Sequence, residues 1–350
     1  MARSLPRVAY RGGPFVRHPR IVTISFEGDD PTLVSRLERF GDTITRSEWW
    51  RAVTAGYCTK GEGCIGEGRR GRHIRLAEAL PAKVDDVEVG ALLERRAKAG
   101  RLGRLDPETL LVVYLPPEVA LADAFVARYC DRGPRALHRA LRLKRVTVPY
   151  AVLPRCGDQA ELTASASQEI LEATTNPDPA ARGFAFEQSS ANLGFTAAGV
   201  EPVDPCGQLA RDGRWTLESG FVVQRAWSNR AASQGRDPCI PAPPGPYLAL
   251  VPRQPTVRLA QEGASATITL DAAADRPAPV WGAGALDLTG RHDQQRYVEL
   301  SLERSKVAAG QSVKLTITVR KLHPNELVVV GIVSTLGRRS HTWPLAVVMR

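Results

Sequence analysis

Hydrophobic and polar positions along the chain follow two different patterns. In the first half, apolar β-branched runs (Ile21–Phe26, Thr109–Leu115, Val146–Leu153) alternate with stretches whose apolar residues are three and four apart, such as Pro31–Phe40 and Asp85–Gly100. Runs of the first kind predict strands, and spacings of the second kind predict amphipathic helices. Strands that alternate with helices indicate an α/β core.

Three positions carry more specific signals. Thr109–Leu115 is almost continuously apolar, which predicts a central strand covered on both faces. Pro149 lies within Val146–Leu153 and has no backbone N–H, which predicts that this strand lies at an edge. Ser47 is expected to cap a short helix that contains Trp49 and Trp50.

The second pattern is a series of short segments with period-two alternation. They lie between Gly, Pro and Asp residues, and they are Thr256–Leu259, Ala266–Leu270, Tyr297–Leu302, Ser312–Val319, Leu327–Val333 and Thr342–Val348. Such regular short strands predict an all-β sandwich of the Ig-like kind. Pro241–Pro246 precedes them as a stiff linker. We therefore expect an irregular lead-in at 1–20, an α/β (α+β) domain at 21–245 that is loop-rich after Asp178, and a β-sandwich at 253–350.

The positive charge of the chain raises the question of whether it binds nucleic acid. The 350 residues carry a formal net charge of +10, and the excess comes mainly from arginines in the first half, densest in Arg69–Arg75, Arg95–Arg104 and Arg135–Arg145. A basic surface can attract nucleic acid. No nucleic-acid motif or aromatic ladder interrupts these runs, so a solvated surface is the favoured interpretation. Nucleotide binding at the Gly-rich loop Tyr57–Gly71 is excluded, because its glycines do not match a phosphate-binding motif.

Six cysteines, without any C-x-x-C motif, favour three disulfides over a metal cluster. Six cysteines allow about 15 pairings, and the simplest joins sequence neighbours: Cys58–Cys64, Cys130–Cys156 and Cys206–Cys239. Disulfides imply an oxidising, extracytoplasmic compartment, secreted or periplasmic. The N-terminus M-A-R-S-L-P-R has no apolar region of a signal peptide, and no stretch approaches the length of a transmembrane segment.

The stretch Ser165–Pro177, S-A-S-Q-E-I-L-E-A-T-T-N-P, carries the candidate chemistry. It is expected to form a helix, at Glu161–Thr175, on which Gln168 and Glu172 share a face and Glu169 lies one step round. This is the spacing of H-E-x-x-H, in which the first and last residues bind zinc and the Glu is the general base. Here the two ligand positions are Gln and Glu.

The same stretch resembles a family of largely uncharacterised exported bacterial proteins with a zincin-like helix, S-H-E-I-x-E-A-x-T-D-P. In that family an acidic-x-x-D-x-C segment, a V-Q-x-x-W-S-N strand and a closing Cys follow. This chain has Glu201–Cys206, Val223–Asn229 and Cys239 in that order, with Gln168 in place of His and Asn176 in place of Asp. The resemblance implies a metallopeptidase-like scaffold, and it agrees with the pairings Cys130–Cys156 and Cys206–Cys239.

The resemblance also implies a ligand set. Gln168 and Glu172 would be helix ligands, Glu201 or Asp204 would complete the shell, and Glu169 would be the base. Since an amide is a poor zinc ligand, three interpretations remain open. The first is a degenerate site in a non-catalytic binding or structural protein, a pseudoenzyme. The second is an active zinc-dependent peptidase that draws on a histidine such as His138. The third is an oxygen-ligated structural calcium site.

Two further expectations concern partners and packing. An appended β-sandwich is commonly a binding module, so a cell-surface glycan or a protein is the expected partner. Trp227 is expected to fill the core and Asn229 to satisfy a turn. The other histidines show no spacing that implicates them in a metal site.

Overall fold

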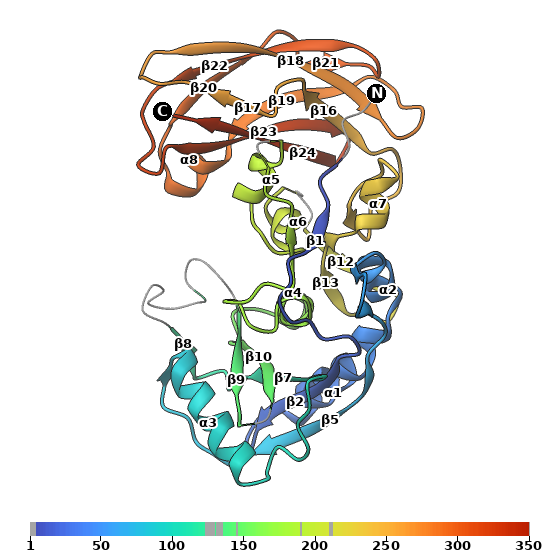
Figure 1. The fold of residues 1–350 in the computed structure, drawn as a ribbon, viewed down its shortest axis with the longest axis vertical. Coiled ribbons are helices and arrows are strands. Elements are labelled where there is room, and N and C mark those ends of the chain that lie inside the picture. Colours follow the sequence, from blue (N-terminus) through green and yellow to red (C-terminus); the bar gives the residue numbers. More distant parts are fainter. Residues whose placement is uncertain are drawn as a thin grey trace. The chain divides into compact units, whose positions relative to one another are not determined.

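The computed structural model describes residues 5–122, 130, 136–144, 146–189, 191–209 and 213–349. The chain forms two compact units (Figure 1). We call Tyr10–Ala185 with Arg214–Gln224 the α/β unit, and Met1–Ala9 with Phe186–Gly213 and Arg225–Arg350 the β unit.

The α/β unit is built on a five-stranded sheet in the order β5-β2-β7-β10-β9. Its strands are β2 (Arg20–Phe26), β5 (Arg69–Leu76), β7 (Thr109–Tyr114), β9 (Leu137–Arg142) and β10 (Thr147–Leu153). β2 is parallel to β5 and to β7, β10 is parallel to β7, and β9 is antiparallel to β10. All six residues of β7 are buried, so the central strand expected at Thr109–Leu115 is confirmed.

The edge position expected from Pro149 is wrong, because β10 pairs with both β7 and β9. The register explains how the sheet tolerates the proline. Pro149 lies opposite Ala140 of β9, while the pairing with β7 begins one residue later, at Tyr150 and Leu111. The missing N–H therefore lies just before the parallel ladder starts.

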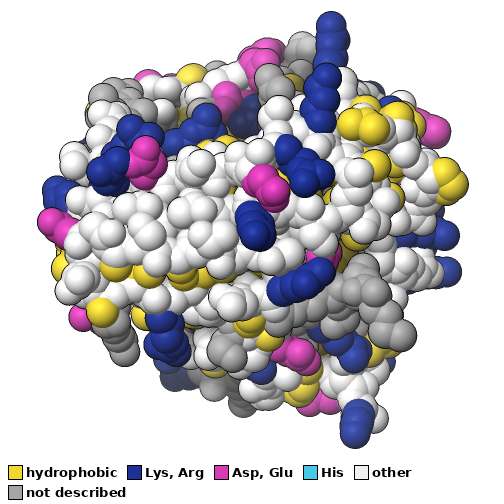
Figure 2. All heavy atoms as spheres, turned by 90° about the horizontal axis from the view of Figure 1, so that it is seen from above, with side chains coloured by type: hydrophobic (Ala, Val, Ile, Leu, Met, Phe, Trp, Pro, Cys, Tyr) yellow, Lys and Arg dark blue, Asp and Glu magenta, His cyan; other side chains and the backbone are white. Residues whose placement is uncertain are grey.

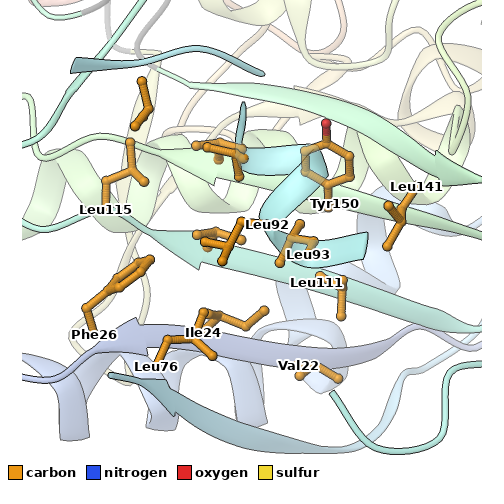
Figure 3. Close-up of a cluster of buried hydrophobic side chains, with 14 of the residues drawn as sticks. Val22, Ile24, Phe26, Leu76, Leu92, Leu93, Leu111, Leu115, Leu141 and Tyr150 are labelled. Carbon is orange, nitrogen blue, oxygen red and sulfur yellow. The ribbon is translucent and has the colours of Figure 1, made fainter. Parts of the chain in front are cut away.

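Helices cover both faces of this sheet. On one face, α3 (Asp86–Lys98) contributes Val89, Leu92 and Leu93 to a buried cluster with apolar side chains of the strands (Figure 3). The other face is contacted by α1 (Pro31–Thr43) and α4 (Gln159–Thr175). α3 begins with a capping box between Asp85 and Glu88, which fixes its first turn.

The smaller elements of the α/β unit include the helix that Ser47 was expected to cap. It is α2 (Glu48–Thr54), and Ser47 Oγ accepts from the N–H of Trp50 at 3.1 Å. The others are η1 (Ile44–Arg46), β3 (Cys58–Thr59), β4 (Gly63–Cys64), β6 (Lys83–Val84), β8 (Ala120–Leu121), β12 (Arg214–Thr216) and β13 (Val222–Gln224).

The two larger β-sheets of the β unit, stacked in Figure 1, have the strand orders β16-β18-β22-β20 and β17-β24-β23-β19-β21. The strands are β16 (Leu248–Pro252), β17 (Thr256–Arg258), β18 (Ser265–Ala274), β19 (Trp281–Asp287), β20 (Val298–Leu302), β21 (Lys306–Val307), β22 (Ser312–Val319), β23 (Leu327–Leu336) and β24 (Arg339–Val348). The unit also contains α5 (Leu193–Ala197), α6 (Asp204–Leu209), β14 (Ala226–Trp227), α7 (Asn229–Ser233), β15 (Cys239–Ile240) and α8 (Leu288–Asp293).

Three predicted boundaries need correction. The chain does not divide at the Pro-rich linker, because residues 186–213 and 225–252 belong to the β unit. Trp227 packs against Phe186 and Phe195 there, at centroid distances of 4.9 and 5.5 Å. The sheets begin at Leu248 rather than 253, since β16 pairs with β18. The lead-in at 1–20 is not wholly irregular: β1 (Val8–Tyr10) is a strand, and residues 1–4 lie outside the described part. The chain passes between the units within β1, within β11 (Phe184–Phe186), after Gly213 and after Gln224.

The structure joins the cysteines as neighbours, Cys58–Cys64, Cys130–Cys156 and Cys206–Cys239, as expected.

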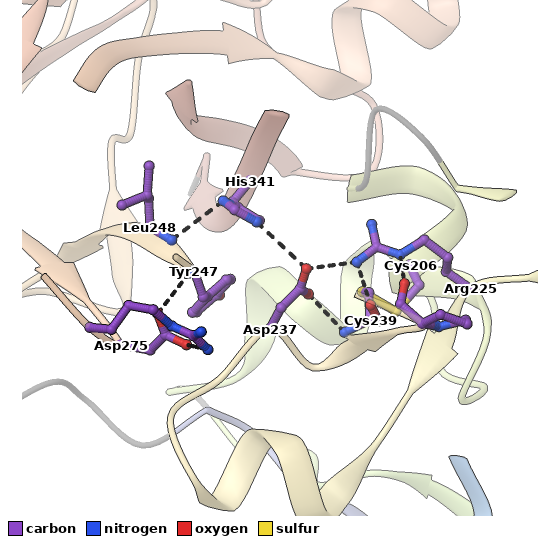
Figure 4. A network of polar contacts seen from close by, with 10 residues as sticks. Cys206, Arg225, Asp237, Cys239, Tyr247, Leu248, Asp275 and His341 are labelled. Atoms are coloured by element: carbon purple, nitrogen blue, oxygen red, sulfur yellow. Dashed lines mark hydrogen bonds and ion pairs between the residues drawn. A yellow bond between two sulfur atoms is a disulfide. The ribbon is translucent and has the colours of Figure 1, made fainter. Parts of the chain in front are cut away.

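The third bond lies beside a buried polar network in the β unit (Figure 4). Arg225, 3% exposed, donates from Nη2 to Asp237 Oδ2 at 2.6 Å and to the carbonyl of Cys239, and from Nε to the carbonyl of Pro241 at 2.7 Å. His341 Nε2 lies 3.5 Å from the same Asp237 oxygen. These side chains line a pocket of about 30 Å³.

This network makes the stability of the β unit sensitive to acid. Burial raises the pKa of Asp237, but the hydrogen bond from His341 and the charge of Arg225 outweigh it, so the pKa lies below its ordinary value. A lowered pKa stabilises the fold above the unfolded value of about 3.9 and loses that contribution as pH falls through the folded value. Denaturant midpoints at pH 6 and pH 3 should therefore differ more for the native chain than for Asp237→Asn. If the midpoint shifts equally between the two pH values in both proteins, Asp237 does not cause the sensitivity to acid.

The basic runs are dispersed over several elements. Arg69–Arg75 lies in the edge strand β5, where Arg69 pairs with Glu108 at 3.1 Å. Arg139 and Arg142 pair with Asp86 and Asp178, while Arg135 and Arg145 lie outside the described residues. On the face in Figure 2, Lys and Arg side chains lie among Asp and Glu side chains.

Within the described part, no helix is long and apolar enough to cross a membrane.

Candidate functional site

The candidate site is organised by α4, which the sequence places with capping and stop signals at its two ends. Asp158 Oδ1 accepts from the N–H of Glu161 at 2.8 Å and caps the N-terminus. Asn176 caps the C-terminus, and Pro177 follows and cannot continue the helix. Instead of one apolar face, the helix is buried on nearly all sides. The strands β10 and β13 both pack on the helix. The many small residues of α4 (Ala, Ser and Thr) let these strands approach it closely.

The strand β13 is fixed to α4 by polar side chains of the helix. Ser167 Oγ accepts from the N–H of Gln224 at 2.8 Å, and Thr163 Oγ1 accepts from the N–H of Val222 at 3.3 Å. The V-Q part of the family-like strand is therefore next to the helix.

His138 reaches the same helix from β9. Successive residues of a strand point to opposite faces. Leu137 and Leu141 belong to the cluster with α3, so the side chain of His138 points to the opposite face, which α4 covers. His138 lies opposite Ala151 of β10, in the interior of the ladder, and its position is set by that pairing.

The structure brings four of the predicted residues together. His138 Nδ1 lies 3.1 Å from Glu169 Oε2 and 3.9 Å from Glu172 Oε2. Gln168 Nε2 donates to Glu172 Oε1 at 3.4 Å. The side chains of His138, Glu169 and Glu172 are 7% exposed or less, whereas Gln168 is half-buried. Burying ionisable groups is costly unless they are paired or bound to a cation. The cluster offers one imidazole and two carboxyl groups to each other or to such an ion.

The other predicted ligands are in the β unit. Asp204 begins α6, and its Oδ2 accepts from the N–H of Glu201 at 3.0 Å. Trp227 fills the core as expected. Asn229 does not simply satisfy a turn: its side chain accepts from the N–H of Val8 at 2.9 Å and donates to the carbonyl of Val8 at 2.7 Å, so it fixes β1.

Asn176, where the family-like motif has Asp, is fully buried and organises the chain after α4. Its Oδ1 accepts from the N–H groups of Gly183 and Phe184 at 2.9 and 3.1 Å. Asn176→Ala would leave both donors without this acceptor, and should lower the free energy of unfolding by about 2 kcal/mol. A carboxylate oxygen can accept the same two bonds, so Asn176→Asp should cost less than Asn176→Ala, with the burial of its charge offsetting part of the difference. Denaturant titration compares the two variants, and equal losses would show that the acceptor is not what matters.

The strand β9 was missed by sequence reasoning, which treated this part only as a basic run. The available signal was the alternation in L-H-R-A-L-R, with Leu137 and Leu141 on one face and His138 on the other. Arg139 obscures this alternation, because it is a charged residue on the same face as Leu137 and Leu141. The structure accommodates its charge through an ion pair with Asp86 at 2.7 Å.

Comparisons with known proteins add no identity. No protein-family model matches the chain, and no curated protein matches its sequence. Among solved structures, the Pseudomonas aeruginosa CupB2 chaperone matches at 16% identity and a TM-score of 0.23, over 29% of this chain and 55% of that one. A chimeric titin Z1Z2 matches at 18% identity and a TM-score of 0.21, over 30% of this chain and 93% of that one. A Bacteroides ovatus GH5 xyloglucanase matches at 12% identity and a TM-score of 0.19, over 30% of this chain and 19% of that one.

Proposed function

We propose that the chain is a non-catalytic member of an exported metallopeptidase-like family, in which the cluster around α4 has a binding or structural role. The position of Glu169 supports this proposal. A general base must reach the water that attacks the substrate. The carboxylate of Glu169 is instead 6% exposed and lies 3.1 Å from the imidazole of His138. The adjacent ligand position holds Gln168, a neutral amide.

A second candidate function is binding of a divalent cation by the same cluster, and the position of His138 favours it. Zinc bonds to imidazole nitrogen and carboxylate oxygen are about 2.0–2.2 Å long. His138 Nδ1 and Glu172 Oε2, 3.9 Å apart, are therefore within reach of one ion. An imidazole in the donor set shifts the preference from calcium towards zinc. A zinc ion held there would supply a Lewis acid.

Elemental analysis and peptidase assays on the same preparation separate these candidates. The protein is purified from an oxidising compartment without chelator or His-tag. We expect no peptide hydrolysis above background. Neither chelator nor Glu169→Gln should change that background rate. Hydrolysis that is lost under both treatments would overturn the non-catalytic proposal.

Matched variants locate any metal that is found. About one equivalent of zinc, lost in Glu172→Gln and in His138→Gln but kept in Glu161→Gln, would establish the cation site. Glu161 is the control because it lies on the same helix and pairs with Arg214 at 2.9 Å, away from the cluster. Glu201→Gln tests the expectation that Glu201 is a further ligand. Zinc that binds only to Gln168→His would mean that the scaffold has lost one ligand.

The compartment and the partner follow from other features. Three disulfides indicate an oxidising environment, which supports a secreted or periplasmic location. Engagement of a cell-surface glycan or protein by the β unit is checked by binding of the full chain to envelope polysaccharide. No binding to polysaccharide or envelope proteins would remove that proposal.

A further inference from the structure

The disulfide Cys58–Cys64 differs from Cys206–Cys239 in its exposure and in its place in the fold. It joins the two short strands β3 and β4, in which Cys58 and Cys64 are directly opposite each other. Their Cα atoms are 3.9 Å apart, against 5.4 Å for Cys206–Cys239. Cys64 is exposed and Cys58 is half-buried, whereas Cys206 and Cys239 are 0% and 6% exposed. An external thiol can therefore reach the first bond, while the third is enclosed.

Two positive side chains lie in or beside the turn that this bond closes. Lys60 is exposed in the turn between the two cysteines. The guanidinium of Arg17 lies against Gly63, with Nη2 3.0 Å from the place where a Cβ of residue 63 would be. Glu62 is the acidic residue of the turn. A net positive surrounding stabilises a cysteine thiolate, which is both the nucleophile and the leaving group in disulfide exchange.

The base of the hairpin is held by contacts that do not involve sulfur. The N–H of Ile65 donates to the carbonyl of Tyr57 at 3.0 Å, and the N–H of Gly66 donates to the carbonyl of Arg17 at 2.8 Å. Trp50 Nε1 donates to the carbonyl of Gly66 at 2.9 Å. Tyr57 and Ile65 are buried. Opening the bond would thus release only the turn between residues 58 and 64.

We propose that Cys58–Cys64 is a thiol–disulfide exchange site that reacts with external thiols while both units stay folded. The thiolate of the reductant attacks Sγ of the exposed Cys64, the S–S bond breaks, and Cys58 leaves as a thiolate that takes up a proton. A second thiolate then attacks the reductant sulfur of this mixed disulfide and releases Cys64, which is protonated in turn. The protein gains two electrons and two protons, and two thiols are oxidised to one disulfide.

The test is graded reduction of the full chain under native conditions at pH 7. Glutathione represents a monothiol and dithiothreitol a dithiol. Free thiols are alkylated after each step, and peptide mass spectrometry assigns them to cysteine pairs. We expect Cys58–Cys64 to be half-reduced at a reductant concentration at least tenfold below that needed for the enclosed pair Cys206–Cys239, with an unchanged circular dichroism spectrum. Reduction of Cys206–Cys239 together with Cys58–Cys64 or before it, or loss of the folded spectrum on reduction of Cys58–Cys64, would overturn the proposal.

Charge variants test the electrostatic part. Arg17→Gln and Lys60→Gln should each slow exchange at Cys58–Cys64 several-fold at low ionic strength, and salt should reduce the difference. Arg11→Gln, another exposed arginine of the same segment, is the matched control and should have no effect. Equal rates for all three variants and the native chain would show that Arg17 and Lys60 do not assist, and the proposed basic environment of the site would be wrong.

Discussion

Asp237→Ala is expected to lower the free energy of unfolding of the β unit by roughly 3–5 kcal/mol. The substitution leaves the charge of Arg225, 3% exposed, without its carboxylate partner at 2.6 Å. It also removes the acceptor for the N–H of Cys239, bonded to Asp237 Oδ1 at 3.0 Å. A buried charge that loses its partner cannot regain the water that it gave up on folding, and this explains the size of the effect. Denaturant unfolding followed by tryptophan fluorescence measures it.

A matched control is available in the same unit. Arg253 and Asp271 form an ion pair at 3.0 Å in which both side chains are about half exposed. Exposed pairs contribute little because water replaces either partner, so Asp271→Ala should leave the midpoint nearly unchanged. A small effect of Asp237→Ala, similar to that of Asp271→Ala, would show that water enters the network around Arg225.

Replacing both Cys206 and Cys239 by alanine is expected to lower the stability of the β unit by roughly 3.5–4 kcal/mol. The bond joins residues 33 apart in the sequence, and the entropy that a disulfide removes from the unfolded chain grows with the length of the loop. Cys58 and Cys64 are 6 apart, so the corresponding double variant should lose only about 2 kcal/mol from the α/β unit. Thermal unfolding of both variants provides the comparison. A larger loss from the short loop would mean that loop length does not govern the effect.

The limits of sequence reasoning are clear at Pro149 and at the domain boundary. A proline has no backbone N–H to donate, which favours an edge strand. Whether the neighbouring strand needs that donor depends on the residue at which the pairing of the two strands starts. Here the pairing with β7 starts one residue later. Composition changes at Pro241–Pro246, yet the chain divides elsewhere because packing between distant aromatic residues, such as Phe186 and Trp227, decides which segments form one core.

By itself, the sequence determined the features that depend on neighbours along the chain. The cap at Ser47, the helix α4 and the apolar strand β7 all follow from local hydrogen bonding and periodicity. Only the tertiary structure decided that His138 meets Glu169 at 3.1 Å, 31 residues away. That contact depends on β9 pairing antiparallel with β10, so that His138 points to the face of the sheet covered by α4. The alternation around His138 is a local signal for the strand, but which strand it pairs with is set by long-range packing.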